Sequence, residues 1–400
     1  MTVRVNKQPF NLREKLSELE RPIGVKGNEL MGAETAQDAR DLVSAGRKNM
    51  IINGDMRIDQ RYGGSSRDIA GGTNEYVVDR FIFRDSISTS VRVQRNTLSA
   101  STDPPGFRYA VKMSCLGNDV SISNTEYLRI QQYIETNNLK CDWGIQNTDY
   151  LTLSFWVKSS VPGKYHVNLE DGDASPLYLK PYYINQADTW QKVELTYPPP
   201  PSGSWITSTD NGIGMRITWS LTIGPSYVSS TEEGWITSYY MAGPGQVNFV
   251  GGTGNAFWLT GVQLERGRNA TEFEHRPYTE ELGLCQRYFI RMKGSTGDHG
   301  TSAGDGGIAT LANWTTTNAY GPIFLGTEMR TPPSLAGFSG VKYFSGGNQT
   351  SLSGSNVAIV GTMSNRVELR LTGLSSLLQG GAGWVRLAAT NDYMDFNAEL

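Results

Sequence analysis

The sequence predicts a mainly β protein, an antiparallel β-sandwich of the jelly-roll type that follows a short helical N-terminal arm and precedes a smaller C-terminal β-domain. Glycine accounts for 45 of the 400 residues, above the ~7% of an average protein, which indicates many turns. Apolar and polar side chains alternate in short segments, as in half-buried strands. Gly, Pro, Asn and Asp separate these segments without a helical pattern between them, which favours a sandwich over a parallel sheet. The expected domains are 1–47, 48–280 and 281–400.

Residues 1–47 are predicted to form the helical arm. The clearest helix covers 35–45, where Thr35 can cap the first turn and Gly46 offers a left-handed stop. Its apolar stripe consists of Ala36, Ala39, Leu42 and Val43. Because this stripe is too small to build a core, the helix packs on its own copies in an oligomer, on a neighbouring protein, or back on its own domain. We interpret the segment as an attachment and oligomerisation arm.

Three segments inside the sandwich show the two-residue period clearly. In 151–158 and 215–222 every second residue is apolar, so each segment predicts a half-buried strand whose polar residues face solvent. Residues 193–197 predict another strand. It ends at the prolines of 198–201, because proline cannot donate to a sheet ladder.

The stretch 261–289 contains a histidine, a cysteine and several carboxylates, and we interpret it as a domain junction. Apolar side chains change face at Gly261, which predicts a one-residue bulge in the closing strand of the sandwich. Pro277 then breaks the chain, 279–282 can form one helical turn, and 285–288 begins the next domain.

The C-terminal part is rich in Gly, Ser, Thr and Asn, especially near 294–307, 345–356 and 378–384. Between these stretches lie strand-like runs at 357–363 and 366–371. This pattern indicates a smaller β-domain with long loops, and loops commonly carry binding specificity.

Composition and charge argue against several ligands and locations. A net charge of −3 does not provide the positive surface that nucleic acids attract. No window holds the roughly 18 consecutive apolar residues of a membrane helix, and the first residues lack the apolar run of a signal peptide, so we expect synthesis in the cytoplasm and no membrane span. Cys115, Cys141 and Cys285 lack CxxC spacing, so neither a disulfide framework nor a zinc knuckle is expected. No cofactor is expected.

Candidate catalytic and metal-binding residues do not form a recognisable site. Cys285 and His275 are close in sequence, but a thiol nucleophile also needs an orienting third group that their neighbours do not supply. Glu272 and Glu274 share one face of a strand while His275 points to the other, so the three do not converge on a metal. A structural calcium is compatible with a sandwich, but spacing does not locate its ligands. Loop acids that could pair for glycoside hydrolysis are more simply solvated charge: Asp171, Asp173, Glu232 and Glu233.

Aromatic residues beside predicted turns are the candidates for ligand binding. Sugar rings can stack on aromatic faces, so such residues can form a carbohydrate platform. The alternative is that several of them belong to the core, where large aromatic side chains are common. The candidates for glycan stacking are Trp205, Trp235, Tyr239 and Tyr240.

Seven short motifs together resemble a known module. They are NMIINGDM at 49–56, VDRF at 78–81, SFWVKS at 154–159, DTWQK at 188–192, GVQLE at 261–265, FEHRP at 273–277 and CQRY at 285–288. In this order and spacing they resemble a β-sandwich module of tailed-bacteriophage fibre and related virion proteins. The module is also similar to carbohydrate-binding jelly rolls, whose usual first strand matches NGDM.

Motifs outside the sandwich extend this resemblance. PFNLREKL at 9–16 and GRKN at 46–49 are similar to the virion-attachment ends of fibre proteins from phages of cyanobacteria. In the C-terminal part, MRTPP at 329–333 also fits the pattern.

The resemblance implies a non-enzymatic virion protein, a homotrimeric tail fibre. Residues 1–47 would anchor it to other tail or capsid proteins, and its β-domains would recognise a host-surface polysaccharide or receptor. Two alternatives stay open: an architectural connector or decoration fibre without a ligand, and a glycan depolymerase. A depolymerase would show an acidic groove and usually a parallel β-helix repeat, and the sequence shows no such repeat.

Overall fold

The computed structural model describes residues 48–139, 143, 149–201, 205, 211–294, 306–387 and 389–400. The chain divides into two units, Met1–Lys48 and Asn49–Leu400, and the description below concerns the second. The predicted helix at 35–45, with its stripe, lies outside the described residues, so the arm stays a prediction. The stripe residues are Ala36, Ala39, Leu42 and Val43.

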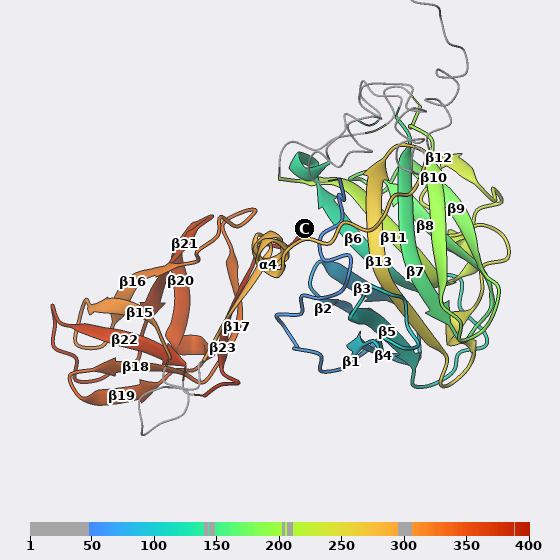
Figure 1. Ribbon diagram of the computed structural model, residues 1–400. Helices are drawn as coiled ribbons and strands as arrows, with labels where there is room; N and C mark the ends of the chain where they lie inside the picture. Colours follow the sequence, from blue (N-terminus) through green and yellow to red (C-terminus); the bar gives the residue numbers. More distant parts are fainter. Residues whose placement is uncertain are drawn as a thin grey trace, which may run out of the picture. The chain divides into compact units, whose positions relative to one another are not determined.

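The first part of Asn49–Leu400 is an antiparallel jelly-roll β-sandwich of two sheets (Figure 1). One sheet consists of β1 (Arg67–Ala70), β4 (Ser90–Thr97), β5 (Tyr109–Cys115), β7 (Leu151–Ser159), β10 (Gln191–Tyr197) and β13 (Ala256–Arg266). The other consists of β2 (Asn74–Val78), β3 (Phe81–Asp85), β6 (Tyr127–Glu135), β8 (Gly163–Glu170), β9 (Leu177–Ile184), β11 (Ile213–Ile223) and β12 (Gly234–Ile236). Their orders are β1-β4-β5-β13-β7-β10 and β12-β9-β8-β11-β6-β3-β2.

The alternating apolar residues build the core between the two sheets. β7, β10 and β11 confirm the strands predicted at 151–158, 193–197 and 215–222. The prediction of a half-buried strand is wrong for β11 and for the first half of β7. On their polar sides, Thr218 and Ser220 of β11 and Thr152 and Ser154 of β7 are buried as well. Protein therefore covers the outer face of each sheet at these positions. Apolar residues of β7 and β11 with no exposed surface are Leu151, Leu153, Phe155, Val157, Met215, Ile217, Trp219 and Leu221.

β13 contains the bulge predicted at Gly261. Its pairing with β7 changes register between Thr260 and Gln263, and Gly261 has a φ of 62°, a left-handed value that favours glycine. The shift brings the apolar residues on both sides of the bulge into one core, namely Phe257, Leu259, Val262 and Leu264.

The segment 49–56, which was expected to include the first strand, is not a strand. Asn53 and Met56 have φ values of 61° and 57°, which an extended strand does not allow. The segment instead lies beside β13 through side-chain bonds. Asn49 Nδ2 donates to the Val262 carbonyl at 3.1 Å, and the Leu264 amide donates to Asn49 Oδ1 at 3.0 Å.

The helix α4 (Tyr278–Gln286) follows the sandwich and confirms the predicted helical turn. Arg276, just before it, is buried and pairs with Glu281 at 3.3 Å. Beyond the helix, Arg287 donates to Glu135 at 2.6 and 2.9 Å. Burial raises the pKa of Glu135, but the bonds from Arg287 and Tyr288 together with the charges of Arg287 and Arg330 outweigh it and hold that pKa below its usual value. These charge-assisted bonds join both ends of α4 to the sandwich.

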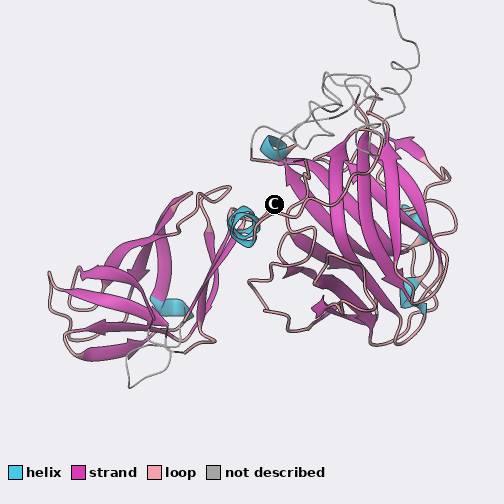
Figure 2. Cartoon of the chain, viewed as in Figure 1, coloured by secondary structure: helices cyan, strands magenta, loops and turns pink. Residues whose placement is uncertain are grey.

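The C-terminal part has two further antiparallel sheets and a core of its own (Figure 2). A three-stranded sheet consists of β14 (Phe289–Lys293), β17 (Ser334–Ser339) and β23 (Tyr393–Asn397), in the order β14-β23-β17. A seven-stranded sheet consists of β15 (Gly306–Asn313), β16 (Ala319–Phe324), β18 (Val341–Ser345), β19 (Asn348–Ser351), β20 (Val357–Met363), β21 (Arg366–Leu371) and β22 (Ala382–Leu387). Its order is β19-β18-β22-β15-β16-β21-β20. β20 and β21 confirm the strands predicted at 357–363 and 366–371.

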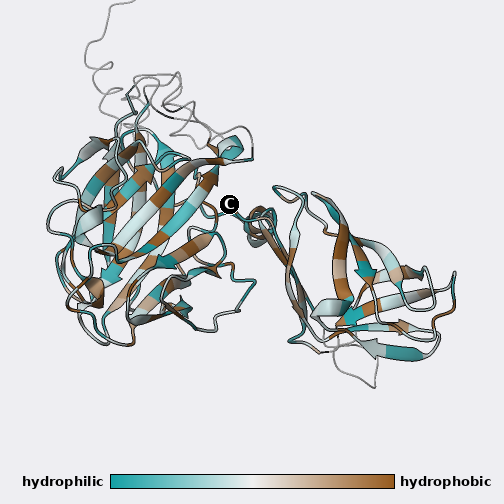
Figure 3. Cartoon of the chain, turned by 180° about the vertical axis from the view of Figure 1, so that it is seen from behind, coloured by the Kyte–Doolittle hydropathy of each residue, from teal (hydrophilic) through white to brown (hydrophobic). Residues whose placement is uncertain are grey.

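Figure 3 shows hydrophobic and hydrophilic residues interleaved along the strands, as expected for strands that pack one face against a core.

Helices are few in the described part of the chain. Besides α4 there are short 3₁₀ helices, η1 (Thr136–Asn138), η2 (Pro225–Tyr227), η3 (Phe249–Gly251) and η4 (Gly354–Asn356). Among the described residues, no helix has the length and apolar character needed to cross a membrane.

Replacing Gly261 by alanine is expected to destabilise the sandwich more than the same change at Gly63. Both residues have left-handed φ values, 62° and 58°, so each change costs about 1 kcal/mol in backbone strain. A Cβ at Gly261 would also lie 2.7 Å from the Phe107 ring and 3.0 Å from Trp156, whereas at Gly63 nothing lies within 4 Å. Urea denaturation should therefore show a loss of unfolding free energy about 1–3 kcal/mol larger for Gly261→Ala than for Gly63→Ala. Equal losses would contradict close packing at the bulge.

Candidate functional site

The outer face of the seven-stranded sandwich sheet carries a buried set of polar side chains, here called the polar face. They stand on the central strands β6, β11 and β8 and form three rows across the sheet. All are buried except Arg216, which is half-buried. Because buried polar groups need partners, this face requires a covering segment. The rows are Tyr133–Arg216–Glu170, Gln131–Thr218–Asn168 and Arg129–Ser220–His166.

The covering segment (225–247) is held by hydrogen bonds from the polar face to its backbone. The carbonyl of Met241 accepts from Asn168 Nδ2 at 3.0 Å and from Ser220 Oγ at 2.6 Å. Within the face itself, Gln131 Nε2 donates to Thr218 Oγ1 at 2.7 Å. The side chains of the sheet therefore determine where the covering segment lies.

His166 is a neutral member of the polar face. Burial lowers the pKa of its imidazole to about 4. Its Nδ1 lies 2.8 Å from Gln246 Oε1, and Gln246 Nε2 donates to the Ser220 carbonyl at 3.0 Å. This amide orientation makes Nδ1 the donor and Nε2 an acceptor, and no described residue donates to Nε2. A Cβ on Gly243 would lie 2.9 Å from Nε2, so the segment approaches closely at a glycine.

Glu170 is the buried acid of the polar face. Burial raises the pKa of its carboxyl, although the guanidinium groups of Arg129 and Arg216 and the Thr218 hydroxyl act in the opposite direction. From the described residues, no hydrogen bond of standard geometry reaches either carboxyl oxygen. Arg216 donates instead to the Gly172 carbonyl at 2.6 Å. The carboxyl therefore keeps its proton at a higher pH than an exposed glutamate does.

Three tyrosines, here called the tyrosine strip, form an aromatic surface beside the polar face. Tyr227 makes edge-to-face contacts with Tyr127 at 6.1 Å and with Tyr239 at 5.9 Å between ring centroids. Arg129 donates to the Tyr239 hydroxyl at 2.6 Å and lies 4.7 Å from the Tyr127 ring. Tyr239 is 39% exposed, so the strip reaches the surface. Arg129 thereby links the buried polar face to an exposed aromatic one.

The structure divides the four predicted glycan-stacking residues between two places. Tyr239 belongs to the tyrosine strip, and its neighbour Tyr240 is half-buried. Trp205 is only 4% exposed and packs against Trp143 and the half-buried Trp235, with ring centroids 4.8 and 6.1 Å away. Trp205 is therefore a core residue. The alternative that large aromatic residues fill the core applies to it.

The four loop acids have separate structural surroundings. Glu232 pairs with Lys164 at 2.6 Å, and Glu233 pairs with Lys180 at 2.5 Å. Asp171 is buried, and its Oδ1 accepts from the Asp173 amide at 2.9 Å in the turn after β8. These contacts are typical of surface ion pairs and of a turn.

The histidine and cysteine of 261–289 lie in different surroundings. The exposed ring of His275 contacts Phe107 and Phe273 at 5.6 and 4.9 Å. Cys285 is buried, and burial raises the pKa of its thiol. The described residues contain no cluster of His, Cys, Asp or Glu that could hold a metal. Cys141 lies outside the described residues.

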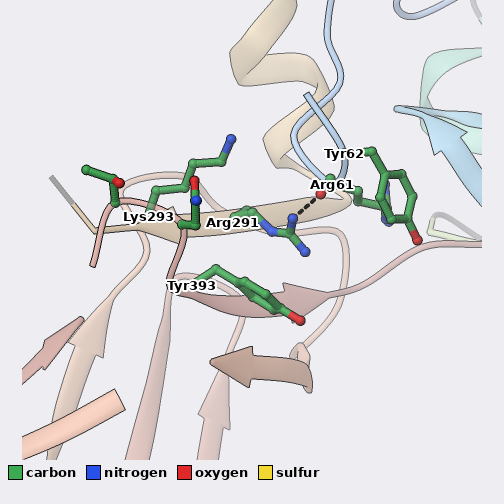
Figure 4. A pocket seen from close by; sticks show the side chains of 7 residues that line it. Arg61, Tyr62, Arg291, Lys293 and Tyr393 are labelled. Carbon is green, nitrogen blue, oxygen red and sulfur yellow. Dashed lines mark hydrogen bonds between the residues drawn. The ribbon is translucent and has the colours of Figure 1, made fainter. Parts of the chain in front are cut away.

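The arginines that line a small pocket beside β14 already have partners within the protein (Figure 4). Its volume is about 150 Å³, below the usual range for small-molecule sites. Arg291 on its wall donates to Asp395 at 2.7 and 2.5 Å and stacks 4.0 Å from the Tyr393 ring. Arg61, also on the wall, pairs with Glu399 at 3.2 Å. We interpret it as a structural feature.

The residue types on β11 indicate the polar face, although their two-residue spacing does not. Exposed strand faces usually carry charged residues, whereas β11 has Thr218 and Ser220 at successive outward positions. Small uncharged polar residues in such a row indicate a covered face. No comparable signal identified Tyr127 or Tyr227, because their contacts join residues about 100 positions apart.

Neutral His166 should make the sandwich lose stability as the pH falls. Unfolding restores an ordinary pKa near 6.5, so between pH 6.5 and about 4 the unfolded chain takes up a proton that the folded one does not. This costs up to about 3 kcal/mol. The unfolding free energy of His166→Asn relative to wild type should rise by this amount as the pH falls across that window, in urea titrations. A His166→Asn difference that stays flat across this pH window would contradict the assignment.

Comparison with known proteins finds only distant likenesses, and they are structural. No family model matches the chain, and no curated protein matches its sequence. Among solved structures, the enzymatically active domain of tailspike protein 4 of bacteriophage CBA120 aligns at 12% identity and a TM-score of 0.29, over 55% of this chain and 21% of that one. The chain therefore spans about a fifth of that tailspike structure.

Several carbohydrate-binding modules align over nearly their whole length. The CBM22-1 xylan-binding domain of Paenibacillus barcinonensis Xyn10C shares 11% identity at a TM-score of 0.24, over 52% of this chain and 97% of the module. The family 11 module of Clostridium thermocellum in complex with a β-1,3-1,4-mixed-linked tetrasaccharide shares 11% identity at a TM-score of 0.24. The alignment covers 52% of this chain and 98% of the module. The fold assignment of this chain rests on its own strand order and registers.

Proposed function

We propose that this chain is a non-enzymatic bacteriophage virion protein, a homotrimeric tail fibre that binds glycans of the host surface. The observation that carries the proposal is the tyrosine strip, in which Tyr239 is exposed, Tyr127 and Tyr227 are half-buried, and Arg129 contacts both Tyr127 and Tyr239. Sugar rings pack on aromatic faces, and phenol hydroxyl groups supply the hydrogen bonds that sugars need. The order of sequence motifs supports the virion role.

Several features support binding without hydrolysis. Glycosidases need two carboxyl groups facing each other across the sugar, about 5–9 Å apart. Glu232 and Glu233 are each paired with a lysine, and Asp171 holds a turn. Glu170 has a raised pKa, as a general acid would need, but it is fully buried beneath the covering segment. A polymer cannot reach it there.

Attachment and trimerisation are assigned to residues 1–47 in this proposal. The small stripe of the predicted helix suits close packing among copies of the chain or against another virion protein. Three copies of a weak glycan site then bind a repetitive polysaccharide more tightly than one, because later contacts are intramolecular.

Retention on polysaccharide without release of sugar is the expected result. The full-length protein is passed over a panel of immobilised bacterial capsular polysaccharides and lipopolysaccharides, and soluble reducing sugar is assayed afterwards. Tyr239→Ala should weaken retention about tenfold, because it removes an exposed ring of the strip. Tyr278→Ala should not, although Tyr278 is 53% exposed, since it lies on α4.

The other outcomes separate the alternative functions. Sugar release would favour a depolymerase, and absence of both retention and release would favour an architectural connector. If Tyr239→Ala and wild type are retained equally, the tyrosine strip is not the glycan-binding surface. Sedimentation of the full-length protein as a monomer would contradict the trimer.

A further inference from the structure

Residues of the motif GVQLE meet a threonine near the motif FEHRP in a hydrogen-bonded cluster at the end of β13. Gln263 and Glu265 of GVQLE are two residues apart on β13, so their side chains lie on one face of the strand. They are 0% and 3% exposed. Thr271, two residues before FEHRP, contacts both side chains. The cluster, here called the Thr–Glu–Gln cluster, therefore brings together a hydroxyl, a carboxylate and a primary amide.

Glu265 bonds to both of the other groups, with one carboxylate oxygen for each. Its Oε2 accepts from the Thr271 hydroxyl at 2.6 Å, and its Oε1 accepts from Gln263 Nε2 at 2.8 Å. The Thr271 backbone amide also donates to Oε1 at 2.9 Å, which fixes the orientation of the carboxylate. One carboxylate is thus placed to take a proton from the hydroxyl and to deliver a proton to the amide nitrogen.

The side-chain amide of Gln263 is oriented by bonds at both of its ends. Its Oε1 accepts from the Glu274 backbone amide at 2.8 Å, and its Nε2 donates to the Glu272 carbonyl at 3.2 Å. The Glu274 N–H therefore lies where negative charge would develop on Oε1 if the amide carbon were attacked, as a donor of an oxyanion hole does. Thr271 Oγ1 lies 3.4 Å from Nε2, the atom bonded directly to that carbon. The arrangement contains a nucleophile, a base and a polarised amide.

We propose that Thr271 and Gln263 join in an intramolecular ester, which the folded protein forms on itself. Thr271 Oγ1 attacks Cδ of Gln263 while its proton passes to Glu265, and the negative charge on Oε1 is stabilised by the Glu274 N–H. The bond between Cδ and Nε2 then breaks, Glu265 returns the proton to Nε2, and ammonia leaves. A hydroxyl and a primary amide are thus exchanged for an ester and ammonia, and no other reactant is needed.

Burial favours this reaction and protects its product. The fold holds the two partners in contact, so their reaction is intramolecular, and the lack of exposed surface on Gln263 keeps water from hydrolysing the ester. The ester connects β13 to the segment that leads to α4. A pull on the chain beyond Thr271 then reaches the sandwich through a covalent bond, which suits a fibre under mechanical load. The inference does not depend on glycan binding.

Mass spectrometry of the intact, full-length protein tests the ester. Wild type should be lighter than its sequence mass by about 17 Da, because one molecule of ammonia is lost. Thr271→Val, which lacks the hydroxyl, and Glu265→Gln, which lacks the carboxylate, should each keep the full mass of their sequence. Thr271→Ser keeps the hydroxyl and should lose ammonia. The matched control Thr279→Val, at an exposed position of α4, should lose it as wild type does.

Trypsin digestion locates the link, whether or not every variant folds well. Arg266 and Arg268 lie between the two partners, so digestion separates the peptides that contain Gln263 and Thr271 unless an ester joins them. In wild type these two peptides should stay joined. Mild alkali should then separate them by hydrolysing the ester, which leaves a carboxylate at position 263.

Three contrary results would overturn the inference. A wild type of full sequence mass would mean that the Thr–Glu–Gln cluster consists of hydrogen bonds alone. A loss of the same mass in Thr271→Val would assign it to another reaction, such as succinimide formation at the Asn–Gly pair 211–212. Loss of ammonia in Glu265→Gln would contradict the role of that carboxylate as the base.

Discussion

The buried polar face of the sandwich is the constraint on which its surface depends. Polar side chains on β6, β8 and β11 lose their hydration when the protein folds. Each one that finds no hydrogen-bond partner therefore lowers the stability of the folded state by kilocalories per mole. The covering segment supplies partners for Asn168, Ser220, His166 and Arg129, chiefly through the Met241 carbonyl and Gln246. In doing so it places Tyr239 over Arg129. The aromatic surface proposed to bind glycan thus follows from satisfying buried hydrogen bonds.

The C-terminal part of Asn49–Leu400 is packed separately from the sandwich. Among its described residues, the seven-stranded sheet carries exposed large side chains such as Phe324 and Trp384. Each part has its own apolar core. Outward-facing residues of one part can therefore change without repacking the other. This suits proteins that recognise variable polysaccharides, where weak sites gain strength from repetition.

Several strands were predictable, because alternation of apolar and polar residues indicates that one face of the strand is buried. The strands at 151–158 and 215–222 and the bulge at Gly261 follow from that pattern alone. The prediction of a first strand at NGDM is wrong because Asn53 and Met56 take left-handed conformations, and Asn53 is held by bonds to nearby Ile58 and to distant Asp79 and Glu281. The prediction that Trp205 stacks on a glycan at the surface is wrong for a related reason. Its partners, Trp143 and Trp235, are far from it in sequence.

The sequence by itself determined the antiparallel β class, the positions of several strands, the helical turn within α4 and the motif order on which the virion proposal rests. Periodicity and turn residues act locally, so they can be read along the chain. Only the tertiary structure decided which outward faces are covered and which tyrosines meet. Those facts depend on contacts between residues distant in sequence, as between Tyr127 and Tyr227. Local periodicity does not determine which distant segment pairs with a strand or covers it.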